Sequence, residues 1–468
     1  MTYLLALQWT LITAIGIGGA QTTATVTPVV EAEQNVYTYT PANNGAGPMW
    51  CAGSTCIVRT GTEVFASGLE TLKDFKPLNN CRWLLFQNTP AGWQLIQKDA
   101  KDRTREPCPL ACFPDGPLFL SVNPTLADPK EYGGPARPEI LQLDIANPTG
   151  PFKALLPDWK AAPPFTEHSY RSFAADGPNR ELILMQNIGY THSRWVYRNA
   201  QGEWAASGKL AWPFGAEYDR PQPIRVCYPT VMLKNRAVYF CGVSDIMEPY
   251  LKWREFKFKL TNRHWDYDFR RLFYTWSDDI ATGKFHKWIE IASRDKTGGH
   301  IFPCDLWVAP DGRVHLLWTE RALDERLRQK FFPQAKQSHA LNYAIVRDGK
   351  VIYRRSLVFS EEGGSSNLIA SAARFHITPG NHLFVLYYVS GKDADGKRVA
   401  ENRLVRLRND GTATPPITVP LRHPMTSFFT ATVRAGCRPS KYIDMLGIRQ
   451  GSRATISYAR IRLDETRN

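Results

Sequence analysis

The chain has 468 residues, of which 43% are hydrophobic and 22% are charged, and its formal net charge at pH 7 is +14. This hydrophobic content, with 14 Trp, 19 Tyr and 23 Phe, supplies a folded core and excludes a disordered chain. The mean hydropathy of -0.34 argues against a membrane protein, and no segment after the N-terminal stretch approaches the roughly 20 apolar residues that span a bilayer.

The N-terminal stretch differs from the rest of the chain. Residues Tyr3–Gly19 carry no charge, are rich in Leu, Ile and Ala, and end in small residues before Gln21. This pattern predicts a signal peptide over residues 1–20, although no Lys or Arg precedes the apolar run. We expect a leader over residues 21–34 and an exported protein that is secreted, periplasmic or held at the cell surface.

From residue 35 to residue 468 the chain repeats one sequence pattern about seven times. Each repeat has an apolar strand, a turn, a second apolar strand, and a third strand with alternating Tyr, Trp and Arg. Such repetition predicts one all-β domain, a seven-bladed β-propeller, and no long stretch shows sustained helical periodicity. A strand near Asn35–Tyr39 is expected to complete the last blade after Ser457–Leu463. The expected second strands are Ile57–Ser67 in part, Gly116–Asn123, Glu181–Ile188, Arg236–Val243, Arg313–Thr319, His382–Ser390 and Tyr442–Arg449.

Nine cysteines in an exported protein suggest disulfides, and the odd number leaves at least one unpaired. Cys227 and Cys241 face each other across a predicted hairpin within one residue of register, so they are the favoured pair. Cys437 is expected near the start of an inner strand. A zinc site at His300 and Cys304 is the rival interpretation, but four ligands with a familiar spacing are not visible. We therefore predict no metal site and no required cofactor.

The positive net charge predicts acidic partners. The Lys and Arg residues are scattered through the strands, without a basic tail or a nucleic-acid module, so nucleic acid is not expected. An acidic polysaccharide or oligosaccharide fits an exported basic propeller better. We expect a monomer that does not span a membrane.

Functional residues of a propeller are expected where inner strands start and where second strands end, because both lie on one face. His168 precedes the third inner strand, and His192 follows the second strand of the same blade. Each histidine alone is more often a structural residue. Two imidazoles at one rim are a candidate pair for general acid and base catalysis, because histidine titrates near neutral pH.

The run from Glu167 through Tyr197, with Tyr228-Pro229-Thr230 and a degenerate turn at Ser277–Trp288, resembles bacterial-neuraminidase-repeat propellers. Among these are the ulvan lyases of polysaccharide lyase families 24 and 25 and related rhamnosyl-glucuronate hydrolases and lyases. The resemblance covers about Phe165–Arg355, and each motif alone is weak.

The resemblance implies β-elimination at a uronic acid. His168 and His192 match the two family histidines, and Tyr228 matches a tyrosine that serves as acid or base. The family pattern places an arginine near Cys241, and this chain has none there. Neutralisation of the carboxylate must then come from another cation. The candidate substrate-binding residues at the same rim are Arg171, Arg225, Arg254, Arg321, Asp245, Glu248 and Glu320.

Two alternatives remain open. A glycoside hydrolase of the rhamnosyl-glucuronate or sialidase-like type needs carboxylates beside the scissile bond, which Glu248 and Glu320 could supply. A non-catalytic glycan-binding propeller needs neither, because the fold alone does not establish catalysis.

Overall fold

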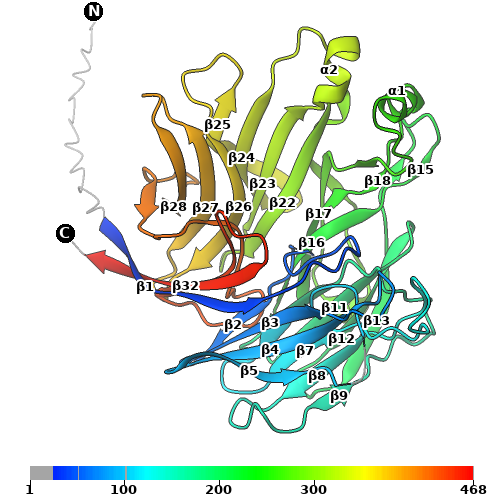
Figure 1. Cartoon of the computed structure of the whole chain (residues 1–468), viewed down its shortest axis with the longest axis vertical. Helices are drawn as coiled ribbons and strands as arrows, with labels where there is room; N and C mark the ends of the chain where they lie inside the picture. Colours follow the sequence, from blue (N-terminus) through cyan, green and yellow to red (C-terminus); the bar gives the residue numbers. More distant parts are fainter. Residues whose placement is uncertain (1–24, 51, 101–102, 467–468) are drawn as a thin grey trace, which may run out of the picture.

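The computed structural model of this chain describes residues 25–50, 52–100 and 103–466, so the predicted signal peptide, residues 1–20, lies outside the described residues. Within these ranges, seven four-stranded sheets stand around a common axis (Figure 1). Each innermost strand packs beside the innermost strand of the next sheet, and β30 (Met425–Thr430) meets β2 (Ile57–Thr60), which closes the ring. The chain is therefore a seven-bladed β-propeller in one domain, as the repeat predicts.

In six blades the chain passes in order from the strand nearest the axis to the outermost strand, and the seventh takes its outermost strand from the N-terminal end. From inner to outer, the first four blades are β2, β3 (Glu63–Thr71), β4 (Cys81–Thr89) and β5 (Gly92–Lys98); β6 (Leu110–Cys112), β7 (Leu118–Val122), β8 (Glu139–Leu143) and β9 (Lys153–Leu155); β10 (Ser172–Asp176), β11 (Glu181–Ile188), β12 (His192–Arg198) and β13 (Trp204–Ala211); β16 (Val226–Lys234), β17 (Ala237–Ser244), β20 (Arg271–Ser277) and β21 (Ile289–Ser293). The last three blades are β22 (Gly298–Val308), β23 (Val314–Leu323), β24 (Ser338–Arg347) and β25 (Lys350–Glu361); β26 (Ile369–Ile377), β27 (Leu383–Lys392), β28 (Arg398–Leu407) and β29 (Ile417–Val419); β30, β31 (Tyr442–Arg449), β32 (Thr455–Thr466) and β1 (Thr25–Thr38).

The ring is closed by pairing the two ends of the described chain. Strand β1 runs antiparallel to β32, from Thr25 opposite Thr466 to Thr38 opposite Thr455. The predicted closing strand near Asn35–Tyr39 is therefore present but much longer, because residues 25–34 of the predicted leader belong to it. This pairing leaves the outer edge of β32 covered instead of open to another chain.

The hairpins follow from local turn chemistry. Between β16 and β17, Lys234 pairs with Ala237 across a two-residue turn, and both turn residues are left-handed, with φ 49° at Asn235 and 67° at Arg236. Two left-handed residues define the turn type that suits the twist of adjacent strands, and asparagine tolerates that conformation. The Asn235 amide donates to Asp176 of the neighbouring blade at 2.6 Å, which fixes the turn.

Short helices and strands lie outside the blade sheets, in the connections between their strands. They are β14 (Phe214–Gly215), β15 (Gln222–Pro223), β18 (Ile246–Met247), α1 (Leu251–Thr261), β19 (Tyr267–Asp268), α2 (Glu325–Phe331) and the 3-10 turns Ile280–Thr282 and Asp295–Thr297. Helix α1 lies in the connection from β17 to β20, and α2 lies in that from β23 to β24, so both rise from the face where the inner strands begin. None of the helices in the described part of the chain is long and apolar enough to cross a membrane.

Helix α1 is held by charge as well as by apolar packing. Its buried residue is Lys257, whose ammonium lies 2.7 Å from Glu248 and 3.0 Å from Asp266. Arg270 adds a second cation to Glu248 at 2.8 Å. Burying one of these charges without its partners would be costly, so the network holds the inserted segment in one position on the ring.

Arg434 joins inner segments of several blades at the centre of the ring. The loop between β30 and β31, residues 431–441, is here called the channel loop, and it carries Arg434 to Asp305 of β22 at 2.7 Å. The same guanidinium donates to the backbone oxygens of Gly53 and Val231 at 2.9 and 3.3 Å. These partners come from different blades, so Arg434 ties the inner strands together along the axis.

The predicted Cys227–Cys241 disulfide is wrong. Cys241 is a buried free thiol, and no disulfide joins two of the described cysteines. A bulge in β16 displaces the register, so that Cys227 pairs with Val243 while Cys241 pairs with Thr230. A bulge adds one residue to one strand and shifts the register beyond it. Two cysteines that would pair in the predicted register therefore no longer face each other. Cys51 lies outside the described residues.

The central ion pair predicts a large effect on stability. Replacing Arg434 with Met leaves Asp305 buried without its cation, and we expect the free energy of unfolding to fall by about 3–5 kcal/mol. Arg438→Met is the matched control, because this arginine of the same loop pairs with Asp115 where both side chains are exposed, at 66% and 75%. Its effect should be at most about 1 kcal/mol. Equal stability of the two variants in urea unfolding would show that the crossing is not a structural tie.

Candidate functional site

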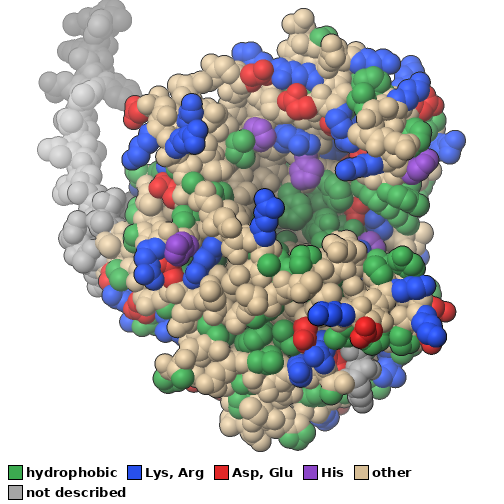
Figure 2. All heavy atoms as spheres, in the orientation of Figure 1, with side chains coloured by type: hydrophobic (Ala, Val, Ile, Leu, Met, Phe, Trp, Pro, Cys, Tyr) green, Lys and Arg blue, Asp and Glu red, His purple; other side chains and the backbone are tan. Residues whose placement is uncertain are grey.

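Aromatic side chains gather on the face where the inner strands begin. Trp50, Tyr170, Tyr228, Phe269 and Phe302 form a group, here called the aromatic mouth, with ring centroids 4.7 Å apart for Trp50 and Tyr170, 5.3 Å for Tyr170 and Tyr228, and 5.1 Å for Tyr228 and Phe302. Except for buried Tyr170, these side chains are partly exposed. Figure 2 shows a hollow over β16 and β22 that hydrophobic and histidine side chains line, with lysines and arginines around it.

An unusual backbone conformation positions two of these rings, those of Tyr170 and Tyr228. Tyr170 and Tyr228 stand at equivalent places in neighbouring inner strands, and both have left-handed backbones, with φ 44° and 49°. In β16 this residue sits in the bulge between Cys227 and Thr230, and Ala372 repeats the conformation in the bulge of β26, with φ 42°. A non-glycine residue in this region is strained, and such strain often marks a functional position.

His168 lies inside this group. Its ring centroid is 4.6 Å from that of Tyr170 and 5.5 Å from that of Trp50. Burial, together with the positive charges of Arg105 and Arg225, lowers the pKa of His168 to about 3. Its Nε2 is buried and has no hydrogen-bond partner among the described residues. The imidazole is therefore neutral at neutral pH and able to accept a proton or a hydrogen bond.

The two predicted histidines lie at different strands of the same blade. His192 is the first residue of the third strand, β12, where it pairs with Ile188 and Ala211, and its Nδ1 lies 2.8 Å from the Thr191 hydroxyl. In the described part of the chain it makes no ring contact with His168. His168 precedes the inner strand of this blade, whereas His192 begins its third strand, which lies farther from the axis. Both histidines are therefore on the face where the inner strands begin, but at different distances from the axis. Tyr228, in contrast, reaches His168 through Tyr170.

A second imidazole lies at the other side of the mouth. His300 is 6.0 Å from Phe269 in centroid distance, and burial together with Arg321 lowers its pKa to about 4. In the sheet register, His300 stands opposite Arg321, which stands opposite His339. Arg321 is exposed, and among the described residues it has no ion pair. This row places a cation beside two imidazoles at the rim.

The other predicted arginines are more constrained. Arg225 stacks on Tyr190 at 4.0 Å and forms a buried ion pair with Asp245 at 2.9 Å. Arg171 differs from its predicted role at the rim, because it is buried and donates to backbone oxygens of the neighbouring blade, including that of Pro107 at 2.7 Å. Arg254, on α1, contacts the sulfur of Met247 at 3.8 Å.

The predicted carboxylates are engaged within the protein. Glu248 is buried between Arg270 and Lys257, and these cations hold its pKa below its usual range despite the burial that raises it. Glu320 is also buried, and it accepts from Arg294 at 2.6 Å and from the indole of Trp318 at 2.6 Å. Both carboxylates therefore support the inserted segments and the sheet rather than facing a shared space.

Sequence reasoning named Trp50 only as one of several aromatic residues that could stack on a sugar, and it considered His300 only as a metal ligand. His300 could have been found from its place at the start of the inner strand β22, whereas Trp50 lies in the segment before β2, where the strand repeat does not mark it. Arg105 was missed as well; its guanidinium lies 5.5 Å from the ring of Trp50. No group of three metal-ligating side chains occurs among the residues that the structure describes.

The opposite face carries a separate cavity of about 840 Å³ between the blades that start with β22 and β26. Its polar lining is largely satisfied by the protein, since Arg313 binds Asp311 at 2.7 Å and His382 binds Glu465 at 2.5 Å. That cavity also has one imidazole nitrogen without a partner among the described residues, Nε2 of His315, but the aromatic mouth places such a nitrogen, Nε2 of His168, beside two aromatic rings. The mouth is therefore the better candidate for ligand binding.

Comparison with known proteins gives similarity of fold. No protein-family model and no curated protein matches the chain. Solved structures that align with it include the α-L-arabinofuranosidase Arb93A of Fusarium graminearum, with 10% identity over 92% of this chain and 98% of that chain, at a TM-score of 0.43. The propeller domain of the Trilobed protease of Pyrococcus furiosus aligns with 9% identity over 89% and 98%, at 0.42. Synechocystis apocarotenoid oxygenase aligns with 10% identity over 96% and 97%, at 0.43.

The pKa of His168 predicts how stability depends on pH. The folded chain resists protonation of this histidine, from the ordinary 6.5 down to about 3, whereas the unfolded chain does not. The unfolded state therefore binds more protons in this window, and stability falls as pH falls through it, by about 1.4 kcal/mol per pH unit for one histidine. In His168→Gln, the loss of stability between pH 7 and pH 5 should shrink by about 2 kcal/mol.

The control for this measurement is His264→Gln, because His264 is exposed at the end of α1. Its urea unfolding at pH 7 and pH 5 should change as that of the parent protein does. An equal pH dependence in His168→Gln and in the parent would contradict the assignment of His168 as a buried neutral imidazole.

Proposed function

We propose that this protein binds a uronate-containing polysaccharide or oligosaccharide at the aromatic mouth and cleaves it by β-elimination. The observation that carries the proposal is the contact of His168 with the rings of Trp50 and Tyr170, which in turn meets Tyr228. Sugar rings present apolar C–H faces that pack on aromatic side chains, and such amphipathic pockets are typical of ligand sites. The net charge of +14 favours the approach of an acidic chain.

The chemistry needs a base for the proton at C5, an acid for the leaving oxygen, and a cation for the carboxylate. His168 is assigned as the base, because its imidazole is neutral and its Nε2 has no partner among the described residues. Tyr228 is assigned as the acid. A pKa of about 3 makes an inefficient base. Burial is the largest cause of this low pKa and the charges of Arg105 and Arg225 add to it; a carboxylate bound beside the imidazole counters the two arginines and so raises the pKa.

The cation is assigned to Arg321. The family that the sequence resembles has an arginine near the position of Cys241, but here the Cys241 side chain is buried in the core. Arg321 is exposed at the rim beside His300, and it forms no ion pair within the described chain. A fixed positive charge at this place lowers the cost of the negative charge that develops when the C5 proton leaves.

Elimination is favoured over hydrolysis by the state of the carboxylates. A hydrolase of the common type needs two carboxyl groups that flank the scissile bond. Glu248 and Glu320, the predicted pair, are each tied to two cations. The expectation of export from the apolar N-terminal stretch belongs to the same proposal, because polysaccharides of this kind are met outside the cell.

Activity tests the proposal directly. Incubation with a panel of uronate polysaccharides should yield unsaturated uronides that absorb near 230 nm, as is general for elimination next to a carboxylate; reducing ends without that absorbance would indicate hydrolysis. His168→Ala and Tyr228→Phe should each lower turnover by about 10²–10⁴. His382→Ala, on the opposite face, is the control and should retain turnover. Binding of the panel without either product would leave a glycan-binding propeller and overturn the catalytic part.

Binding tests the role of the rim cation. Arg321→Gln should weaken binding of an acidic oligosaccharide by about tenfold, a loss of about 1.4 kcal/mol, and the loss should shrink as salt increases. Binding of a neutral oligosaccharide should change little. Arg438→Gln is the control, because it removes one positive charge from the channel loop on the opposite face. Equal weakening in the two variants would show that only net charge matters, and it would contradict a carboxylate site at Arg321.

A further inference from the structure

Two buried thiols from distant parts of the chain lie in contact. Cys112 ends β6, Cys437 lies in the channel loop, and 325 positions separate them in the sequence. Their sulfur atoms are 4.0 Å apart, and the residues are 0% and 6% exposed. A disulfide has a sulfur–sulfur distance of about 2.05 Å, so the sulfurs must approach by about 2 Å to bond.

The backbones around the pair are held together independently of the thiols. The Cys112 amide donates to the Ala435 oxygen at 2.8 Å, and the Ala175 amide donates to the Arg434 oxygen at 2.9 Å. Gly436 has φ 86°, and a Cβ built on it would lie 1.9 Å from the Cys112 oxygen, so only glycine permits this approach. The channel loop is thus fixed against β6, and small rotations of the side chains can join the sulfurs.

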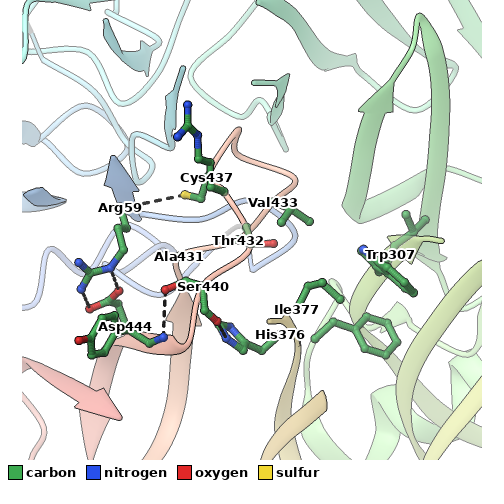
Figure 3. A pocket seen from close by; sticks show the side chains of 14 residues that line it. Arg59, Trp307, His376, Ile377, Ala431, Thr432, Val433, Cys437, Ser440 and Asp444 are labelled. Carbon is green, nitrogen blue, oxygen red and sulfur yellow. Dashed lines mark hydrogen bonds and ion pairs between the residues drawn. The ribbon is translucent and has the colours of Figure 1, made fainter. Parts of the chain in front are cut away.

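The surroundings favour reaction at Cys437. The hydrogen bond from Cys112 lowers the pKa of Cys437, and the Arg59 amide donates to the Cys437 sulfur at 3.4 Å. Figure 3 shows Cys437 directed toward Arg59 at the edge of a cavity of about 20 Å³ that Asp444 and His376 also line. This space, about that of one water molecule, gives the sulfur room to move.

We propose that Cys112 and Cys437 form a disulfide when the folding or native protein meets a small-molecule disulfide oxidant. The Cys437 thiolate attacks the oxidant and releases one small thiol, and the Cys112 thiolate then displaces the second. Two protein thiols lose two protons and two electrons, and the oxidant takes up both pairs to become two thiols. The bond covalently links the last blade to the second blade, across the strand that carries Arg59.

The bond has a structural consequence. The same channel loop carries Arg434 to the centre of the ring, and the last blade is itself completed by the pairing of β1 with β32. A cross-link of two segments so far apart in sequence restricts the unfolded chain strongly and stabilises the folded one. Oxidation is therefore expected to raise the midpoint of thermal unfolding by several degrees. This effect is independent of the aromatic mouth.

The experiment compares protein refolded in oxidised glutathione with protein refolded in excess dithiothreitol. Peptide mapping without reduction should find a linked peptide pair containing Cys112 and Cys437, and thiol titration of the denatured oxidised protein should find two fewer thiols. A map that shows both cysteines unlinked, or linked to other cysteines, after refolding in oxidised glutathione would overturn the proposal.

Variants separate this pair from other thiols. Cys112→Ser and Cys437→Ser should lose the rise in midpoint on oxidation. Cys241→Ser is the matched control, because it removes another buried thiol of the core and should keep both the linked peptide and the rise. If a serine variant does not fold, the peptide map of the parent protein still decides the question. An equal rise in all three variants would assign the stabilisation to a different bond.

Discussion

The crossing of the axis by Arg434 is the constraint on which the rest of the molecule depends. Seven blades leave a space at the centre that side chains must fill, and here a charged group fills it. The guanidinium binds Asp305 and two backbone oxygens from other blades, and Asp305 also accepts the amide of Phe375 at 2.8 Å. Because the inner strands β16, β22 and β26 and the segment before β2 are tied to this one ion pair, their positions around the axis are fixed relative to one another. The aromatic mouth is built on those positions.

The mouth also shows how a repeated backbone can produce an unrepeated site. Tyr170, Tyr228 and Ala372 all have left-handed backbones, and a bulge accompanies Tyr228 in β16 and Ala372 in β26. The left-handed residue thus occurs in several blades, whereas its side chain is aromatic only in the two neighbouring blades that carry Tyr170 and Tyr228. Strained backbone and aromatic side chain together give the two tyrosines their edge-to-face contact, at an interplanar angle of 85°.

Much of the fold can be predicted from the sequence, because alternating apolar and polar residues bounded by turn residues are typical of β-strands. Glu181–Ile188 and Tyr442–Arg449 are second strands with the predicted bounds. Helix α1 escapes the same reasoning, because its buried side is marked by Lys257, and a lysine becomes an interior residue only when distant acids surround it. The predicted pairing of Cys227 with Cys241 is wrong for a similar reason, because no local sequence pattern indicates the bulge in β16. In the candidate site, the repeat predicts the face on which His168, before β10, and Tyr228, near the start of β16, both lie, whereas the distance of His192 from the axis depends on the radial order of the strands.

The charges around the aromatic mouth bear on the protonation of His168. Burial lowers the pKa of His168, and the charges of Arg105 and Arg225 lower it further, although Arg225 is itself paired with Asp245. An acidic group that enters the mouth brings the negative charge that the histidine lacks, so binding and basicity rise together. A neutral ligand brings no such charge and leaves the imidazole a weak base. Under the proposed function, a carboxylate on the ligand counters the two arginines that disfavour protonation of His168, so turnover is expected to depend on the charge of the ligand.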